Sequence, residues 1–264
     1  MQLELPRTGL NGSALVEMLA QLALGPRPAA PPSFVDGLGR WLGWKDAIGL
    51  SAVLQALPLE SPPAPAQPPS RGGADAAPIR RNGISGIGSI GGVGGVDGSA
   101  ALAPLAALEA EFTRVRTALA LTMQLALDDA ASSEDSSSSF LPWRRCCFRL
   151  QQAMEAAVGP LRARARAVLQ AQAAMHPALG TLAALAALDA ALASMLAPRE
   201  QAQLALMPVL LERHFVRLAV HGDRSAPSPF RHDMQGLLQA ELELRLQPAL
   251  GLLDALRAAQ TGTR

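Results

Sequence analysis

The second half of the chain repeats apolar side chains at an alternating spacing of three and four residues. Leu105, Leu108, Phe112, Val115 and Leu119 follow this spacing, which is typical of an α-helix that keeps one seam against a neighbouring helix. This half predicts an all-α fold, an elongated up-down bundle that partly resembles an antiparallel coiled coil. A second seam contains Met154, Val158, Leu161, Ala165 and Val168.

Prolines and polar clusters divide residues 101–264 into four to five predicted helices with short connections. Pro160 predicts a kink or break, Pro198 suits the first residue of a helix, and Pro248 allows a bend. The predicted helices span 102–129, 143–175, 178–196, 198–221 and 230–259.

The first 57 residues contain three shorter helical patterns, at 15–22, 34–42 and 50–57. Ser13 and Asp46 are N-cap candidates. These patterns predict a small three-helix module over residues 1–57.

Residues 58–100 change character, with five prolines between positions 62 and 69 followed by a repeat of Gly, Ile, Val and Ser. Such a segment has too few large side chains to offset the entropy of ordering it. We therefore expect a disordered tether between the module of residues 1–57 and the bundle of residues 101–264.

Composition excludes little about function. The formal net charge of +1 gives no global reason to expect nucleic acid or an anionic membrane. All cationic side chains except Lys45 are arginines, which we interpret as codon bias rather than as selection for bidentate contacts. Tyrosine is absent and aromatic residues make up only 3%, so the usual stacking surfaces of single-strand binders are missing.

The compartment indicated by the sequence is the cytoplasm. The first residues lack the basic region of a signal peptide. The longest uncharged run, 167–188, contains several polar residues and is a poor membrane span, so no transmembrane segment is expected. Cys146 and Cys147 are adjacent and form no disulfide framework.

Two motifs suggest ligand sites but lack the required context. Gly86, Gly88 and Gly91 satisfy G-x-G-x-x-G inside a glycine repeat, without a preceding strand. His214 and His221 are seven residues apart, whereas a helical zinc pair needs a spacing of four and further ligands. We therefore expect surface or helix-end histidines, no cofactor and no metal.

Cys146 and Cys147 follow Trp143, Arg144 and Arg145. Neighbouring arginines lower a thiol pKa, so a reactive cysteine is one interpretation. A buried, inert pair on a helix is the preferred one. No Ser/His/Asp set stands out from chance, and we expect no enzyme activity.

A sign asymmetry in charge separates two neighbouring predicted helices. Six arginines and one glutamate lie between Arg144 and Arg166, whereas residues 97–135 hold seven acids and two arginines. One interpretation is a basic strip for nucleic acid; the preferred one is that two antiparallel helices complement each other. The candidate interaction residues of this strip are Arg144, Arg145, Arg162, Arg164 and Arg166.

Trp41 and Trp44 are the most conspicuous side chains of the first module. One is expected in the core, and the other is a candidate anchor for a protein partner, because tryptophan is enriched at interaction hot spots. Balanced charge in residues 1–57 argues against a DNA-binding helix-turn-helix.

Several phrases in both units carry a resemblance to a known family: RTGL (7–10), WLGWKDAI (41–48), GPLR (159–162), LAALAALD (182–189), PVLLERHF (208–215) and AELELRLQP (240–248). They resemble a proteobacterial family known as a domain of unknown function. The resemblance skips the tether and transfers no functional residues. It implies a place in a multiprotein assembly associated with the cell envelope. Cys146 and Cys147 depart from the aromatic residues expected there, which implies that the thiols are not essential.

Together these observations predict a non-enzymatic, cytoplasmic scaffold or adaptor that acts through helix-helix contacts with a protein partner or by self-association. The alternative is a nucleic-acid-associated regulator that uses the strip from Arg144 to Arg166.

The predicted tether is testable by limited proteolysis. Cleavage should fall between Pro58 and Ala100 and leave a stable fragment that begins near Leu102, because a segment without a core is the most accessible to a protease. Mass spectrometry of the fragments identifies the cut sites. Preferential cleavage between Leu105 and Leu127 contradicts the division.

Overall fold

The computed structural model describes residues 14–22, 43–56, 98–133, 135–220 and 227–262. Every regular element in these residues is a helix, so the predicted all-α class is confirmed. The elements are α1 (Ala14–Gln21), α3 (Trp44–Ala56), α4 (Gly98–Ala131), α5 (Leu141–Met175), a 3₁₀ turn η1 (Pro177–Leu179), α6 (Gly180–Leu204), α7 (Met207–Val220) and α8 (Pro227–Gly262).

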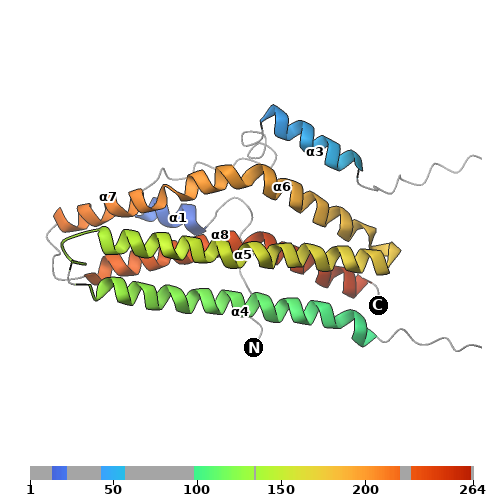
Figure 1. The fold of residues 1–264 in the computed structure, drawn as a ribbon, viewed down its shortest axis with the longest axis horizontal. Coiled ribbons are helices and arrows are strands. Elements are labelled where there is room, and N and C mark those ends of the chain that lie inside the picture. The colour runs from blue at the N-terminus through green and yellow to red at the C-terminus, as the bar shows by residue number, and fades with distance from the viewer. Residues whose placement is uncertain (1–13, 23–42, 57–97, 134, 221–226, 263–264) are drawn as a thin grey trace, which may run out of the picture.

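Helix α5 is the centre of an elongated bundle (Figure 1). It contacts α4, α6 and α8, and α4 also packs on α8. The long helices run back and forth along the same axis. Side chains from α4, α5 and α8 fill the middle, and the largest fully buried ones include Leu108, Leu127, Trp143, Leu150, Leu161, Met234, Leu237 and Leu242.

The apolar seam predicted for α4 faces this core. Leu108 and Leu119 are buried, and Leu105, Phe112 and Val115 pack against the buried cluster. The core position of this seam is confirmed.

The seam predicted for α5 is confirmed up to Ala165, which is buried like Met154, Val158 and Leu161. The next fully buried side chain is Leu169, whereas Val168 is only partly buried. A straight helix has 3.6 residues per turn and drifts away from a strict seven-residue repeat. The buried face of α5 therefore moves by one residue.

Two helices continue through prolines at which we expected a break or a helix start. Pro160 lies within α5 and Pro198 within α6, so the predicted helix start at Pro198 is wrong. The carbonyls that these prolines leave without an intrahelical donor belong to Ala156 and Ser194. Both residues are exposed, so water can supply the missing hydrogen bond.

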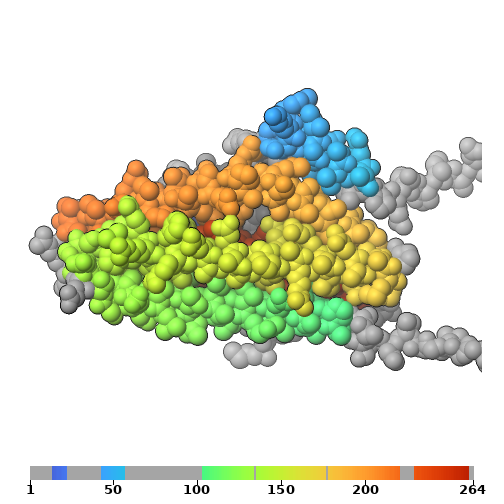
Figure 2. Space-filling view, in the orientation of Figure 1, coloured from blue at the N-terminus to red at the C-terminus, as the bar shows by residue number. Residues whose placement is uncertain are grey.

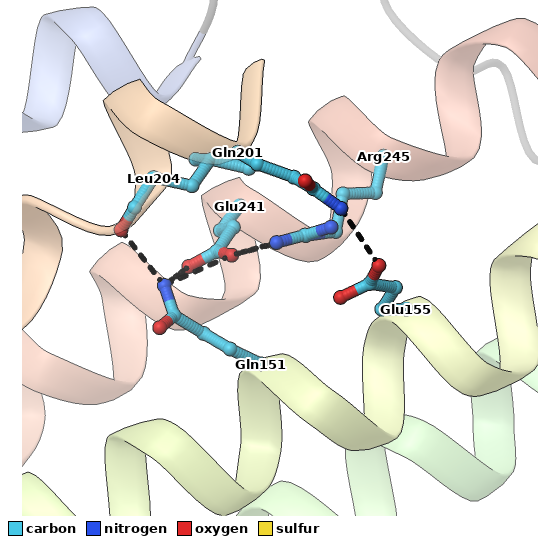
Figure 3. A network of polar contacts seen from close by, with 6 residues as sticks. All are labelled: Gln151, Glu155, Gln201, Leu204, Glu241 and Arg245. Atoms are coloured by element: carbon cyan, nitrogen blue, oxygen red, sulfur yellow. Dashed lines mark hydrogen bonds and ion pairs between the residues drawn. The ribbon is translucent and has the colours of Figure 1, made fainter. Parts of the chain in front are cut away.

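The break that separates α6 from α7 instead falls at Ala205 and Leu206, ahead of Pro208. Pro208 has no N–H, so the carbonyl of Leu204 loses its donor four residues on. Leu204 is buried. The side-chain amide of Gln151 in α5 donates to this carbonyl at 3.1 Å, in place of the absent N–H (Figure 3).

Gln151 also connects the break to a buried ion pair. Its amide donates to the carboxylate of Glu241 in α8, at 3.1 and 3.2 Å. Glu241 is completely buried and accepts two further hydrogen bonds from Arg245, at 2.9 and 3.0 Å. Burying a carboxylate is tolerated only when such partners replace water. Gln151 thus links the end of α6 to the carboxylate that α8 buries.

An aromatic cluster closes one end of the bundle. Trp143 and Phe140 each pack edge-on against Phe230 of α8, and Phe215 of α7 joins them. The indole N–H of Trp143 donates to the carbonyl of Ser136 at 2.9 Å, which anchors the turn between α4 and α5.

The two described helices of residues 1–57 both pack on the bundle. Leu15 of α1 is buried in the main core, and Met18 lies so close to Gly236 of α8 that a Cβ there would be 2.9 Å from it. Helix α3 packs on α6. The pattern at 34–42 and most of the segment 58–100 lie outside the described residues. The three-part division therefore stays a prediction, although α1 and α3 are docked rather than separate from the bundle.

The buried pair predicts an asymmetric mutational response. Glu241→Leu leaves Arg245 buried without its carboxylate and should lower the free energy of unfolding by about 3–5 kcal/mol. The double variant Glu241→Leu, Arg245→Leu should lose much less, because no charge stays unpaired. Urea unfolding measures both. An equal loss in the two proteins contradicts this account of the pair.

Candidate functional site

Helix α3 lies on the outside of the bundle, over α6 (Figure 2). Trp44 is 82% exposed and Ile48 is 55% exposed. A spacing of four places them on one face. The sequence-based prediction does not include Ile48, although its spacing of four residues from Trp44 indicates that the two side chains share a helix face. Trp44 is therefore the exposed tryptophan of the expected pair. Trp41 lies outside the described residues, so its position in a core stays a prediction.

Two contacts hold α3 in place. The carboxylate of Asp46 accepts the N–H of Gly43 at 2.9 Å and an N–H of Arg199 in α6 at 3.3 Å. Gly49 lies against Met195, because a Cβ at this glycine would be 3.1 Å from the Met195 methyl. The predicted N-cap role of Asp46 is wrong: the helix begins at Trp44, and Asp46 caps it from the third position.

The predicted basic strip is divided among several partners. Arg162 and Arg166 both bind Asp189 of α6, at 2.6 and 3.2 Å, and all three side chains are at most 23% exposed. The sequence-based prediction does not include Asp189. The sequence shows that this residue is acidic, but it does not show that α6 places it next to α5.

The remaining arginines of the strip lie closer to solvent. Arg164 binds Glu111 of α4, and Arg144 binds Glu212 of α7. Arg145 forms no ion pair with a described residue. Arg149, which also lies in the strip, binds Asp129 of α4. Complementarity with the acidic helix α4 thus accounts for Arg149 and Arg164, while Arg144, Arg162 and Arg166 pair with α6 and α7.

A groove of about 910 Å³ lies at the start of α5. Its lining combines Arg144 and Arg145 with the hydroxyls of Ser132 and Ser133 and with Phe148. One acid from α4, Asp129, and one from the following turn, Asp135, also line the groove, so it carries both signs of charge.

The cysteines occupy the core side of α5, and their buried position is confirmed. Burial raises the pKa of Cys146 to about 11, against an opposing effect of Arg149, and it raises the pKa of Cys147 further, with a contribution from Glu241. The thiol of Cys146 donates to the carbonyl of Ala126. Protonated, enclosed thiols are poor nucleophiles.

His214 is buried, so its expected surface position is wrong. Arg217 donates to Nδ1 at 2.8 Å. Since arginine cannot accept, the Nε2 proton of His214 donates to Asp233 at 2.7 Å. The ring also packs on Phe230. Among the described residues no cluster of His, Cys, Asp and Glu could hold a metal, and His221 and the glycine motif lie outside them.

The stretch Gly180–Val220 is long and apolar enough to cross a membrane by length and composition. Only 11% of its most apolar window is buried in the protein. Asp189 lies in this stretch and pairs with two arginines of α5, so α6 is bound to another helix of the same protein.

The ion pairs of Asp189 and of Glu111 should contribute differently to the free energy of unfolding. Asp189→Asn removes the carboxylate from two partly buried guanidinium groups and should cost about 1.5–3 kcal/mol of unfolding free energy. The matched change Glu111→Gln affects a pair whose arginine is 65% exposed, and should cost about 0–1 kcal/mol. Chemical unfolding compares them. Equal losses contradict the distinction.

The chain matches the family model "Protein of unknown function (DUF3348)" over residues 1–89 and 95–258. It matches no curated protein and no solved structure. The match runs through part of segment 58–100, so the expectation that the resemblance skips this segment is wrong. The proteobacterial source stays a prediction. Because the family model covers nearly the whole chain, the chain belongs to DUF3348, a family of unknown function.

Proposed function

We propose that this protein is a non-enzymatic scaffold or adaptor that binds a protein partner through the outer face of α3. The observation that carries the proposal is Trp44, a large apolar side chain that is 82% exposed. Ile48 extends the same face. Tryptophan supplies a large contact area at a low cost in side-chain entropy, which is why it dominates interaction hot spots.

The attachment of α3 supports this role. The Arg199–Asp46 pair and the contact of Gly49 with Met195 fix one side of the helix to α6. A partner can then bind the opposite side without first ordering the helix, which lowers the entropic cost of association.

The alternative, a nucleic-acid-associated regulator, receives less support from the arginines. Phosphate binding needs guanidinium groups that are free to replace counterions. Arg162 and Arg166 share a partly buried carboxylate, and Arg144 and Arg164 each have an acidic partner. We rank this function second for that reason.

We place the adaptor in the cytoplasm, in an assembly associated with the cell envelope. Buried free thiols with raised pKa values suit a reducing compartment. The envelope association follows from the resemblance described above.

Substitution of Trp44 tests the proposal. Trp44→Ala should reduce partner capture from native cells roughly tenfold or more, while the free energy of unfolding changes by less than about 0.5 kcal/mol. Quantitative mass spectrometry of affinity-purified tagged protein provides the measurement.

The matched control is Lys45→Ala, which changes an exposed neighbour on the same helix. It should leave capture unchanged. Full capture by Trp44→Ala, or an equal loss in both variants, contradicts the assignment of the α3 face.

A further inference from the structure

Helix α7 is apolar on two sides. Its inner side is buried through Met207, Leu211 and His214. Its outer side carries side chains at spacings of four, three and four, which cover about 60° of the helix circumference at 100° per residue. Leu206, in the turn that precedes α7, extends this pattern by three residues. We call this set the α7 outer seam: Leu206, Val209, Arg213, Val216 and Val220.

The α7 outer seam has no cover among the described helices. Its four apolar members are between 43% and 74% exposed. Alternation of three and four is the spacing by which one helix packs on another. Contiguous exposed apolar surface is typical of protein interaction sites, which makes this seam a candidate for one.

Arg213 lies in the middle of the seam. It is exposed and forms no ion pair with any residue in the described part of the chain. Most arginines of α5 have acidic partners, as does Arg199 of α6. A cation in the middle of an apolar stripe requires an anion from whatever covers the stripe.

The neighbouring α3–α6 contact shows how the chain itself meets this requirement. There α3 packs the backbone of Gly49 against Met195 and places one carboxylate, Asp46, against Arg199. Arg199 and Arg213 belong to consecutive helices of the same outer layer. The same chemistry, an apolar helix with one central acid, fits the α7 outer seam.

We propose that the α7 outer seam binds one amphipathic helix of a partner protein, whose apolar side chains pack on Val209 and Val216 and whose central Asp or Glu pairs with Arg213. This surface is distinct from the α3 face and does not depend on Trp44. With both surfaces occupied, the protein joins two partners.

Charge decides against two other occupants. In a two-fold antiparallel contact between copies of α7, centred on the seam, the two Arg213 side chains would face each other, and like charges in a contact are unfavourable. Insertion into lipid would place the Arg213 guanidinium at the middle of the inserted stripe, where it lacks water.

Two synthetic peptides test the proposal with the full chain. Both are helical, about 21 residues long, with Leu and Val at heptad positions; one has Glu at the central seam position and the other has Lys. Fluorescence anisotropy of labelled peptide measures binding to the wild-type protein, Arg213→Glu, Val216→Ser and Trp44→Ala.

The Glu peptide should bind the wild-type protein roughly fivefold or more tightly than the Lys peptide, and Arg213→Glu should reverse this order. Val216→Ser should weaken both. Trp44→Ala should bind like the wild type, so failure of the α3 proposal and failure of this one are distinguishable. All three substitutions change exposed side chains, and circular dichroism verifies folding.

Three results overturn the proposal. One is equal binding of the two peptides to both the wild type and Arg213→Glu, or no binding at all. Another is a dimer in sedimentation that Val216→Ser abolishes, which assigns the seam to a second copy. The third is co-sedimentation with phosphatidylglycerol vesicles that Val216→Ser abolishes, which assigns it to lipid.

Discussion

The carboxylate of Glu241 is the group on which the arrangement of the bundle depends. It is fully buried, and its hydrogen-bond donors come from Arg245 of α8 and Gln151 of α5. Gln151 in turn donates to the Leu204 carbonyl at the end of α6. A buried charge tolerates few geometries, so these contacts fix the register of three helices that apolar packing alone would leave adjustable.

The same contacts determine which surfaces are open. Because Gln151 satisfies the carbonyl that Pro208 leaves without a donor, the chain can end α6 at Leu204 and restart as α7 without a buried polar penalty. Helix α6 then carries α3 on its outer side, whereas α7 keeps its own outer side free of described helices. The break thus separates one outer layer into a covered and an uncovered part.

Sequence patterns predict the core of this fold well because a seam is local information. The residues from Leu105 to Leu119 lie on successive turns of α4, and those from Met154 to Ala165 lie on successive turns of α5, so their spacing alone indicates which side of each helix is buried. The position of the α6–α7 break is different, since it depends on whether an unpaired carbonyl meets water, as for Ser194, or a distant side chain, as for Leu204. The pairing of Asp189 with Arg162 is likewise beyond a single sequence, because it requires knowing which helices are neighbours.

Arginine shows most clearly why position rather than abundance carries functional information in this chain. Arg245 and Arg162 are largely enclosed with carboxylates, so they contribute to the specificity of packing and are unavailable to a partner. Arg164 pairs near solvent, where screening makes the interaction weak. Arg213 has the same chemistry but lies exposed between valines, where a covering helix would exclude water and strengthen any ion pair it formed. The residue that we propose for recognition is therefore identified by its apolar neighbours and by the absence of an acidic partner among the described residues, neither of which a count of charges can reveal.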